Sequence, residues 1–178
     1  QKIQKGETKD LILIGEALHS RRYAAIADTI FGLRDKVRLV LIAGPSSSGK
    51  TTTSKRISKQ LKVLGMQPVV LEMDNYFVDR ENTPRDEKGD YDFESLLALD
   101  VAFLNQQLFE LLDGKEIEIP FFDFLTGKRA FSGKKLRLEE NQILIMEGIH
   151  ALNPDLTKYI PEENKFRIYA SALTSLAM

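Results

Sequence analysis

Short apolar runs recur along the chain, separated by longer segments with helical periodicity. Each run is almost continuously apolar, and the first three are followed directly by a glycine or an acidic residue. A run of this kind is typical of a parallel strand that is buried on both faces of a sheet. The pattern predicts four such strands, at residues 37–43, 68–73, 143–146 and 166–169.

Two helices are predicted between these strands. Residues 52–64 follow the first strand and end at Gly65, while leucine and valine recur at spacings of four and three over residues 97–111, before Gly114. That spacing places the apolar side chains on one face of a helix. Strands that alternate with helices predict an α/β fold, with a doubly wound, mostly parallel sheet and helices on both faces.

Two further segments complete the predicted organisation. Residues 117–119 and 136–138 alternate apolar and polar residues with period two, which predicts a small antiparallel ribbon inserted into the fold. Residues 1–36 are polar and helix-prone and are interpreted as a helical lead-in or linker from a preceding domain. Residues 37–178 then form the core domain.

A phosphate-binding motif directly follows the first predicted strand. The segment G-P-S-S-S-G-K-T at residues 44–51 matches G-x-x-x-x-G-K-[ST] in full, between a strand and a helix. Small residues let backbone N–H groups surround a phosphate, Lys50 adds a positive charge for the β- and γ-phosphates, and the Thr51 hydroxyl suits Mg²⁺. The sequence therefore predicts ATP and Mg²⁺ as cofactors. The residues predicted to bind the nucleotide are Gly44, Ser46, Ser47, Ser48, Gly49, Lys50, Thr51 and Thr52.

Acidic residues at two strand ends favour a kinase of small molecules among the P-loop proteins. The chain lacks the guanine-reading N-K-x-D of common GTPases and the L-S-G-G-Q of transporter ATPases. Asp74 and Glu147 directly follow the second and third predicted strands, where ligands collect in open α/β sheets. Asp74 could accept a hydroxyl proton, and Glu147 could serve Mg²⁺. A helix cap or a loop carboxylate is the alternative interpretation of each.

The composition of the chain argues against nucleic acids and membranes as partners. The chain has 178 residues, with 25 Lys and Arg against 26 Asp and Glu, and a net charge of −1 argues against nucleic-acid binding. The absence of cysteine excludes disulfides and thiol nucleophiles and fits a cytoplasmic protein. No apolar run reaches the roughly 20 residues that span a bilayer, so no membrane partner is expected. A small-molecule acceptor is the expected partner, and oligomerisation is left open.

Four ordered motifs resemble the uridine kinase/phosphoribulokinase family. They are G-P-S-S-S-G-K-T, M-D-N-Y-F, I-P-F-F-D-F and I-L-I-M-E-G-I-H-A-L, and the resemblance runs from about residue 37 to residue 170. It implies a P-loop kinase fold and transfer of the ATP γ-phosphate to a hydroxyl, the 5′-hydroxyl of uridine or cytidine in true uridine kinases. Residues 1–36 resemble the linker of bacterial uridine-kinase-like proteins that carry a region related to threonyl-tRNA synthetase. The resemblance implies Asp74 and Lys50 as catalytic residues and an acceptor site of Asp92, Phe122, Arg129 and Tyr76.

The chain departs from the family pattern at three places. Gly127 stands where uridine kinases carry a histidine that contacts the pyrimidine, and His150 stands at a usually apolar position. Residues 170–178 contain no charge where an arginine-bearing lid is expected, so the sequence is interpreted as truncated before that lid. Two alternatives therefore stay open: a kinase of a sugar phosphate or a pantothenate-like acceptor, and a nucleotide-binding regulatory module without catalysis.

Overall fold

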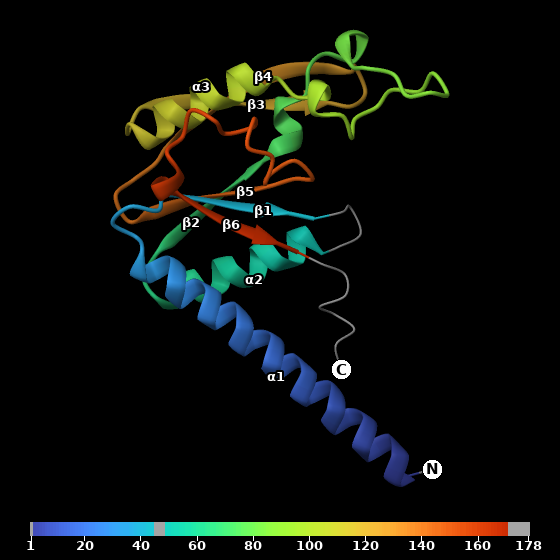
Figure 1. Ribbon diagram of the computed structural model, residues 1–178, viewed down its shortest axis with the longest axis vertical. Coiled ribbons are helices and arrows are strands. Elements are labelled where there is room, and N and C mark those ends of the chain that lie inside the picture. Colours follow the sequence, from blue (N-terminus) through green and yellow to red (C-terminus); the bar gives the residue numbers. More distant parts are fainter. Residues whose placement is uncertain (1, 45–48, 171–178) are drawn as a thin grey trace.

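A parallel sheet of four strands lies at the centre of the computed structural model, which describes residues 2–44 and 49–170 (Figure 1). The strand order is β2-β5-β1-β6, so the two strands on either side of β1 are far from it in sequence. All four strands were predicted by their apolar runs. Their bounds are β1 Leu39–Ala43, β2 Gln67–Glu72, β5 Gln142–Glu147 and β6 Lys165–Tyr169.

Helices cover both faces of the sheet, as predicted for a doubly wound fold (Figure 1). Alternate side chains of β1 enter two separate cores: Leu39 and Leu41 face the side of α3 (Val101–Leu112), whereas Val40 and Ile42 face the side of α1 and α2. All five residues of β1 are buried, because both faces of the strand are covered.

The helix that follows the phosphate motif is α2 (Lys50–Val63). It begins after Gly49, whose φ of 81° lies in the left-handed region that glycine adopts without strain. It ends with Leu64 and Gly65, so the predicted range of 52–64 was nearly correct. Its first turn therefore lies beside the carboxyl end of β1.

The helix α3 begins later than its apolar spacing predicted. Residues Leu96–Ala98 form a separate 3-10 turn, and the α-helix starts at Val101. The carboxylate of Asp100 accepts a hydrogen bond from the amide of Phe103 at 3.1 Å, which caps the helix at that point. The expected start near residue 97 was wrong because this cap overrides the periodicity of the leucines.

The antiparallel ribbon is longer than the two short alternating runs indicated. It consists of β3 (Glu116–Asp123) and β4 (Lys128–Arg137), with a register shift between Glu118 and Pro120. Consecutive phenylalanines in β3 obscured the period-two pattern in the sequence. Together with α3, the hairpin covers the face of the sheet opposite α1 and α2 (Figure 1).

The lead-in forms one long helix, α1 (Lys2–Gly32). Its second half packs on α2 and contributes Ala27 and Ile30, both fully buried, to one of the two cores. Its first half extends away from the rest of the molecule (Figure 1). None of the described helices combines the length and the apolar content that crossing a bilayer requires.

Candidate active site

A pocket of about 530 Å³ opens at the carboxyl ends of the central strands. This is the edge at which open α/β sheets bind ligands. Its walls come from the start of α2, from the segments after β2 and β5, and from the β3–β4 turn. The lining residues are Lys50, Thr51, Glu72, Met73, Asp74, Phe77, Phe93, Glu94, Leu99, Phe124, Glu147, Gly148, Ile149 and His150.

The acidic residues of the pocket lie close together because β2 and β5 are paired neighbours in the sheet. Glu72 pairs directly with Glu147 in the parallel ladder, and both are the last residues of their strands. Asp74 follows two residues later, in the 3-10 turn Met73–Tyr76. The structure thus brings together Asp74, Glu147, Lys50 and Thr51, four of the residues predicted to carry the chemistry.

Thr51 and Glu147 are arranged as a pair that could hold Mg²⁺. The Thr51 hydroxyl donates a hydrogen bond to Glu147 Oε1 at 2.8 Å. The other carboxylate oxygen, Oε2, is buried and has no hydrogen-bond partner among the described residues. A buried carboxylate oxygen without a donor is costly unless something else satisfies it. An oxygen donor set of this kind suits Mg²⁺, which binds few protein ligands and keeps several waters.

The surroundings of Asp74 disfavour the charged form of its carboxyl group. The main cause is desolvation in the pocket, which raises the pKa of Asp74 above its ordinary value. Repulsion from Glu72 and then Glu147 raises the pKa further, while the ammonium of Lys50 lowers it. A carboxylate with a raised pKa is a stronger base, which suits the removal of a hydroxyl proton.

The phosphate motif is described in part. Ser46, Ser47 and Ser48 lie outside the described residues, so their predicted role in nucleotide binding stays a prediction. Gly44 follows β1, and Lys50 and Thr51 form the first turn of α2 and line the pocket. Thr52 lies in the same turn and is exposed, but it does not line the pocket.

Aromatic rings form part of the pocket wall. Phe77, Phe93 and Phe124 line the pocket, and Phe124 is 57% exposed. Phe122, which was predicted to contact the acceptor, lies behind them with 6% exposure. Its ring centroid is 4.9 Å from that of Phe124 and 5.5 Å from that of Phe77, both in edge-on geometry. Phe122 therefore supports the wall, and Phe124 presents a ring to the pocket.

Asp92 and Arg129 lie near the pocket without lining it. The carboxylate of Asp92 accepts a hydrogen bond from the amide of Glu94 at 3.0 Å, which fixes the loop that carries Phe93. Arg129 forms an ion pair with Asp100 at 2.8 Å, and so joins the hairpin to the start of α3. Their predicted contacts with an acceptor stay predictions.

Tyr76 belongs to the core. Its side chain has no exposed surface, and its hydroxyl donates a hydrogen bond to Gln107 Oε1 at 2.8 Å. Burial raises the pKa of the phenol far above its ordinary value. Tyr76 thus lies beneath the site rather than on the pocket wall, because the 3-10 turn that exposes Asp74 directs Tyr76 inward.

Gly127 occupies a position that leaves no room for a side chain. Its φ is +69°, and a β-carbon there would lie 2.8 Å from the β-carbon of Arg80. The Gly127 carbonyl accepts a hydrogen bond from the Arg80 amide at 2.7 Å. Arg80 therefore packs into the space that a side chain at position 127 would need. This packing is consistent with a glycine at the position where uridine kinases carry a histidine.

We expect Gly127→Ala to lower the free energy of unfolding by more than Gly133→Ala does. Both glycines have a positive φ, but a β-carbon at Gly133 meets nothing within 4 Å. Gly133→Ala, the control, should lower the free energy of unfolding by about 1–2 kcal/mol because of its left-handed backbone alone. In Gly127→Ala, overpacking against Arg80 should lower it by about 1–3 kcal/mol more. Urea unfolding of the two variants measures the difference, and equal losses would contradict the packing argument.

His150 lines the pocket and joins two of its walls. Its Nε2 lies 2.6 Å from the carbonyl oxygen of Glu94, so the imidazole connects the segment after β5 to the loop of Phe93. The sequence analysis noted His150 only as a departure from the family pattern, and it did not predict Glu72, Glu94 or Phe93 as lining residues. The position of Glu72 at the end of an apolar run was a usable signal, since Asp74 and Glu147 were found in the same way.

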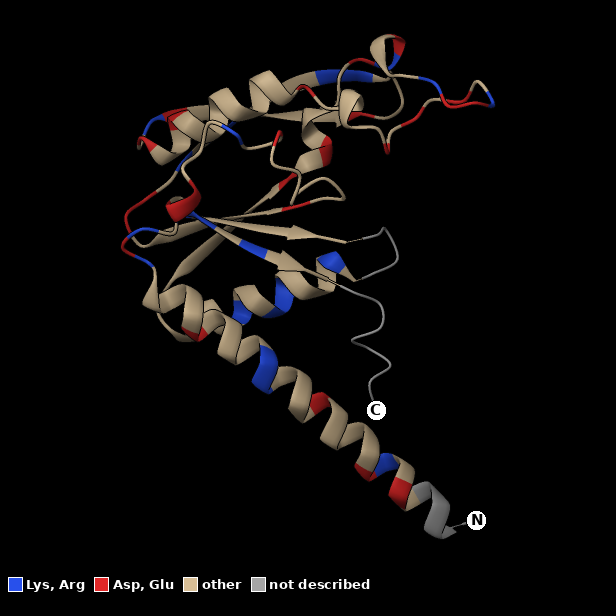
Figure 2. Ribbon diagram, in the orientation of Figure 1, with Lys and Arg blue, Asp and Glu red and all other residues tan. Residues whose placement is uncertain are grey.

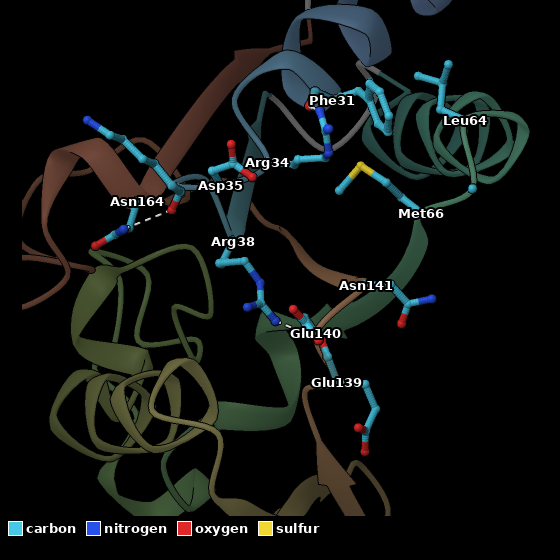
Figure 3. A pocket seen from close by; sticks show the side chains of 12 residues that line it. Phe31, Arg34, Asp35, Arg38, Leu64, Met66, Glu139, Glu140, Asn141 and Asn164 are labelled. Atoms are coloured by element: carbon cyan, nitrogen blue, oxygen red, sulfur yellow. Dashed lines mark hydrogen bonds between the residues drawn. The ribbon is translucent and has the colours of Figure 1, made fainter.

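A second pocket, of about 800 Å³, lies at the opposite, amino-terminal edge of the sheet (Figure 3). Its cationic side chains are already engaged: Arg38 donates to the carbonyl oxygen of Glu139 at 2.8 Å, and Arg34 donates to that of Phe31 at 2.8 Å. Asn164 similarly donates to the carbonyl oxygen of Lys36. These contacts tie loops together, so this pocket is not the candidate site.

Comparison with known proteins agrees with the fold and identifies the family. The model of the Phosphoribulokinase / Uridine kinase family matches residues 39–176. The chain is 32% identical over 134 residues to the uridine kinase of Limosilactobacillus reuteri, covering 71% of this chain and 60% of that protein. It is 37% identical over 119 residues to the uridine kinase of Schizosaccharomyces pombe, covering 66% of this chain and 25% of that protein.

A solved structure is similar over most of the fold. The chain superimposes on a "Possible Uridine Kinase" from Bacillus stearothermophilus with a TM-score of 0.64 and 28% identity, covering 84% of this chain and 79% of the other. Against the bacterial uridine kinase of L. reuteri, the chain spans three fifths of the relative's length.

Proposed function

Because the chain belongs to the phosphoribulokinase/uridine kinase family, we propose that it is an ATP-dependent kinase that phosphorylates a hydroxyl of a uridine- or cytidine-like nucleoside. The observation that carries the proposal is the grouping of Lys50, Thr51, Asp74 and Glu147 in one pocket. Phosphoryl transfer needs a cation for the phosphates, an oxygen donor set for Mg²⁺ and a base for the acceptor, and this group supplies all three.

In the proposed reaction Lys50 binds the β- and γ-phosphates at the start of α2, where the helix dipole also favours anions. Thr51 and Glu147 would hold Mg²⁺. When bound, this ion would neutralise part of the negative charge of the phosphates. Asp74 accepts the proton of the attacking hydroxyl. Its raised pKa, caused mainly by desolvation in the pocket, strengthens it as a base for this proton.

The charge of the pocket favours a neutral acceptor. Four carboxylates line it, those of Glu72, Asp74, Glu94 and Glu147, against the ammonium of Lys50. A sugar phosphate or a pantothenate-like acid would meet net repulsion from the described residues. A nucleoside carries no charge, and its flat base can lie against Phe93 and Phe124. Charge and shape therefore both support a nucleoside over an anionic acceptor.

The test is a panel of acceptors offered with MgATP to the full-length protein. We expect uridine and cytidine to be phosphorylated, and ribulose 5-phosphate and pantothenate to stay unmodified. Transfer only to an anionic acceptor would overturn the nucleoside assignment. ATP binding without transfer to any acceptor would instead support the regulatory module.

The aromatic wall gives a sharper prediction. Phe124→Ala should raise the KM for uridine about 5- to 150-fold, since stacking of a base on an aromatic ring is worth about 1–3 kcal/mol. The KM for ATP should stay within about twofold. Phe121→Ala is the matched control, because Phe121 is 40% exposed on β3, just before the turn that carries Phe124, but does not line the pocket. Steady-state kinetics of both variants measure the effect, and equal KM values would remove Phe124 from the acceptor site.

A further inference from the structure

The first half of α1 exposes an apolar stripe that the rest of the described chain does not cover. Leu11, Ile14 and Leu18 are 62%, 57% and 52% exposed. Their spacing of three and four residues places them on one face of the helix. Ile12 and Leu13 are also exposed, at 52% and 53%, but they lie on other sides of the helix. The continuous stripe of Leu11, Ile14 and Leu18 indicates an interaction surface.

The stripe lies on the side of α1 away from the rest of the fold. At 3.6 residues per turn, Tyr23, Ala27 and Ile30, which pack on α2 and the sheet, fall on nearly the opposite face of the helix. The first half of α1 also extends beyond the sheet (Figure 1). A second helix could therefore lie along the stripe without meeting α2.

The charges at the two ends of the stripe are complementary in one orientation. Glu7 precedes Leu11 by four residues, and Arg22 follows Leu18 by four residues, so the stripe begins with an acid and ends with a base. Both charged side chains are exposed. Figure 2 shows that α1 carries charges of both signs along its length, with a basic position between two acidic ones near its start and a basic segment towards its middle. A like-oriented copy would place equal charges together, whereas a reversed copy places opposite charges together.

The stripe is also symmetric about its centre. Leu11 and Leu18 lie equally far from the point between Ile14 and Gly15, and so do Glu7 and Arg22. Gly15 has nothing within 4 Å of its missing β-carbon, which leaves space for the Ile14 side chain of a neighbouring helix. A two-fold axis at this point would pair each residue with its complement.

We propose that α1 pairs with α1 of a second copy of this chain, in antiparallel orientation, through Glu7, Leu11, Ile14, Leu18 and Arg22. Each leucine at one end packs against the leucine at the other end of the partner helix, and two Glu7–Arg22 ion pairs flank them. The contact is isologous, as two-fold dimers require. The paired segment is about 23 Å long at 1.5 Å per residue. This inference is independent of the proposed function.

Charge exchange tests the pairing directly in the full-length protein. Sedimentation equilibrium should give a dimer for the native chain. Glu7→Arg and Arg22→Glu should each weaken the dimer at least tenfold, since each places like charges face to face, and the double variant should recover at least half of the native association. A monomeric native chain would overturn the proposal, as would a double variant no tighter than the single variants.

Apolar variants locate the face on the helix. Leu18→Glu should abolish the dimer, whereas Leu13→Glu, at a position 53% exposed on another side of α1, should leave the association within about threefold of native. Circular dichroism of both variants shows that the helix remains. Equal effects of the two substitutions would contradict the assignment of the face.

Cross-linking determines the orientation, because the chain contains no cysteine of its own. A mixture of Leu11→Cys chains and Leu18→Cys chains should form the mixed disulfide under mild oxidation. Each variant alone should cross-link much less, since the two introduced thiols lie at opposite ends of the stripe. Efficient cross-linking of each variant with itself would indicate parallel helices and overturn the antiparallel pairing.

Discussion

Asp74→Asn is expected to lower kcat for phosphoryl transfer by about 100- to 10,000-fold, the usual contribution of a positioned general base. The amide keeps the shape of the side chain but cannot accept the hydroxyl proton. Because Asp74 acts on the acceptor, the affinity for ATP should change by less than about threefold. Steady-state kinetics with uridine, together with ATP binding by calorimetry, measure the two quantities separately.

The matched control for this substitution is Glu94→Gln, which neutralises another carboxylate of the same pocket. It should change kcat by less than about tenfold, since no proton transfer is assigned to Glu94. A similar loss of kcat in both variants would mean that the total negative charge of the pocket matters and that Asp74 has no special role as a base. An unchanged rate in Asp74→Asn would remove Asp74 from the mechanism.

The dependence of the rate on pH follows from the same residue. Asp74 must be deprotonated to act, so kcat should fall as the pH drops through its raised pKa. Glu72→Gln removes a neighbouring negative charge and should move this acidic limb to lower pH. Limbs that coincide in the native enzyme and the Glu72→Gln variant would contradict the coupling between these two carboxylates.

Lys50→Ala is expected to lower kcat/KM for ATP by about 100- to 1,000-fold, as for the loss of one preorganised contact to transition-state charge. Lys50 forms the first turn of α2 and reaches the pocket, where it also lowers the pKa of Asp74. The variant should therefore shift the acidic limb of kcat to higher pH. These two effects have one cause, the loss of a positive charge beside the carboxylates.

Lys55→Ala is the control for Lys50→Ala, since Lys55 is an exposed lysine on the same helix and does not line the pocket. It should leave kcat/KM for ATP within about twofold. If both lysine variants retain native kinetics, the phosphate motif does not position the transferred group in the way described.

The strands and the position of the phosphate motif could be predicted because each depends on local pattern. A buried parallel strand needs a continuous apolar run, and the motif needs a strand before it and a helix after it. Asp74 and Glu147 were found by the same logic, at the ends of apolar runs. What no local pattern contains is the strand order that sets Glu72 beside Glu147.

The acceptor side was less predictable because its residues are placed by packing between distant segments. Tyr76 and Phe122 belong to motifs that resemble an acceptor site, yet the 3-10 turn and the β3–β4 hairpin bury both. Phe124, only two residues from Phe122, is the ring that reaches the pocket. The same limitation applies to α1, whose second half joins the core through Ala27 although its sequence predicted only a lead-in.

Single-turnover transfer of label from γ-³²P-ATP to uridine tests the central claim most directly. Native protein in excess over labelled ATP should place the label on the nucleoside as a monophosphate. Asp74→Asn should bind the same ATP and leave the label there over the same time. Label that reaches uridine at equal rates in both proteins, or that appears only as inorganic phosphate in both, would contradict a kinase site built on Asp74.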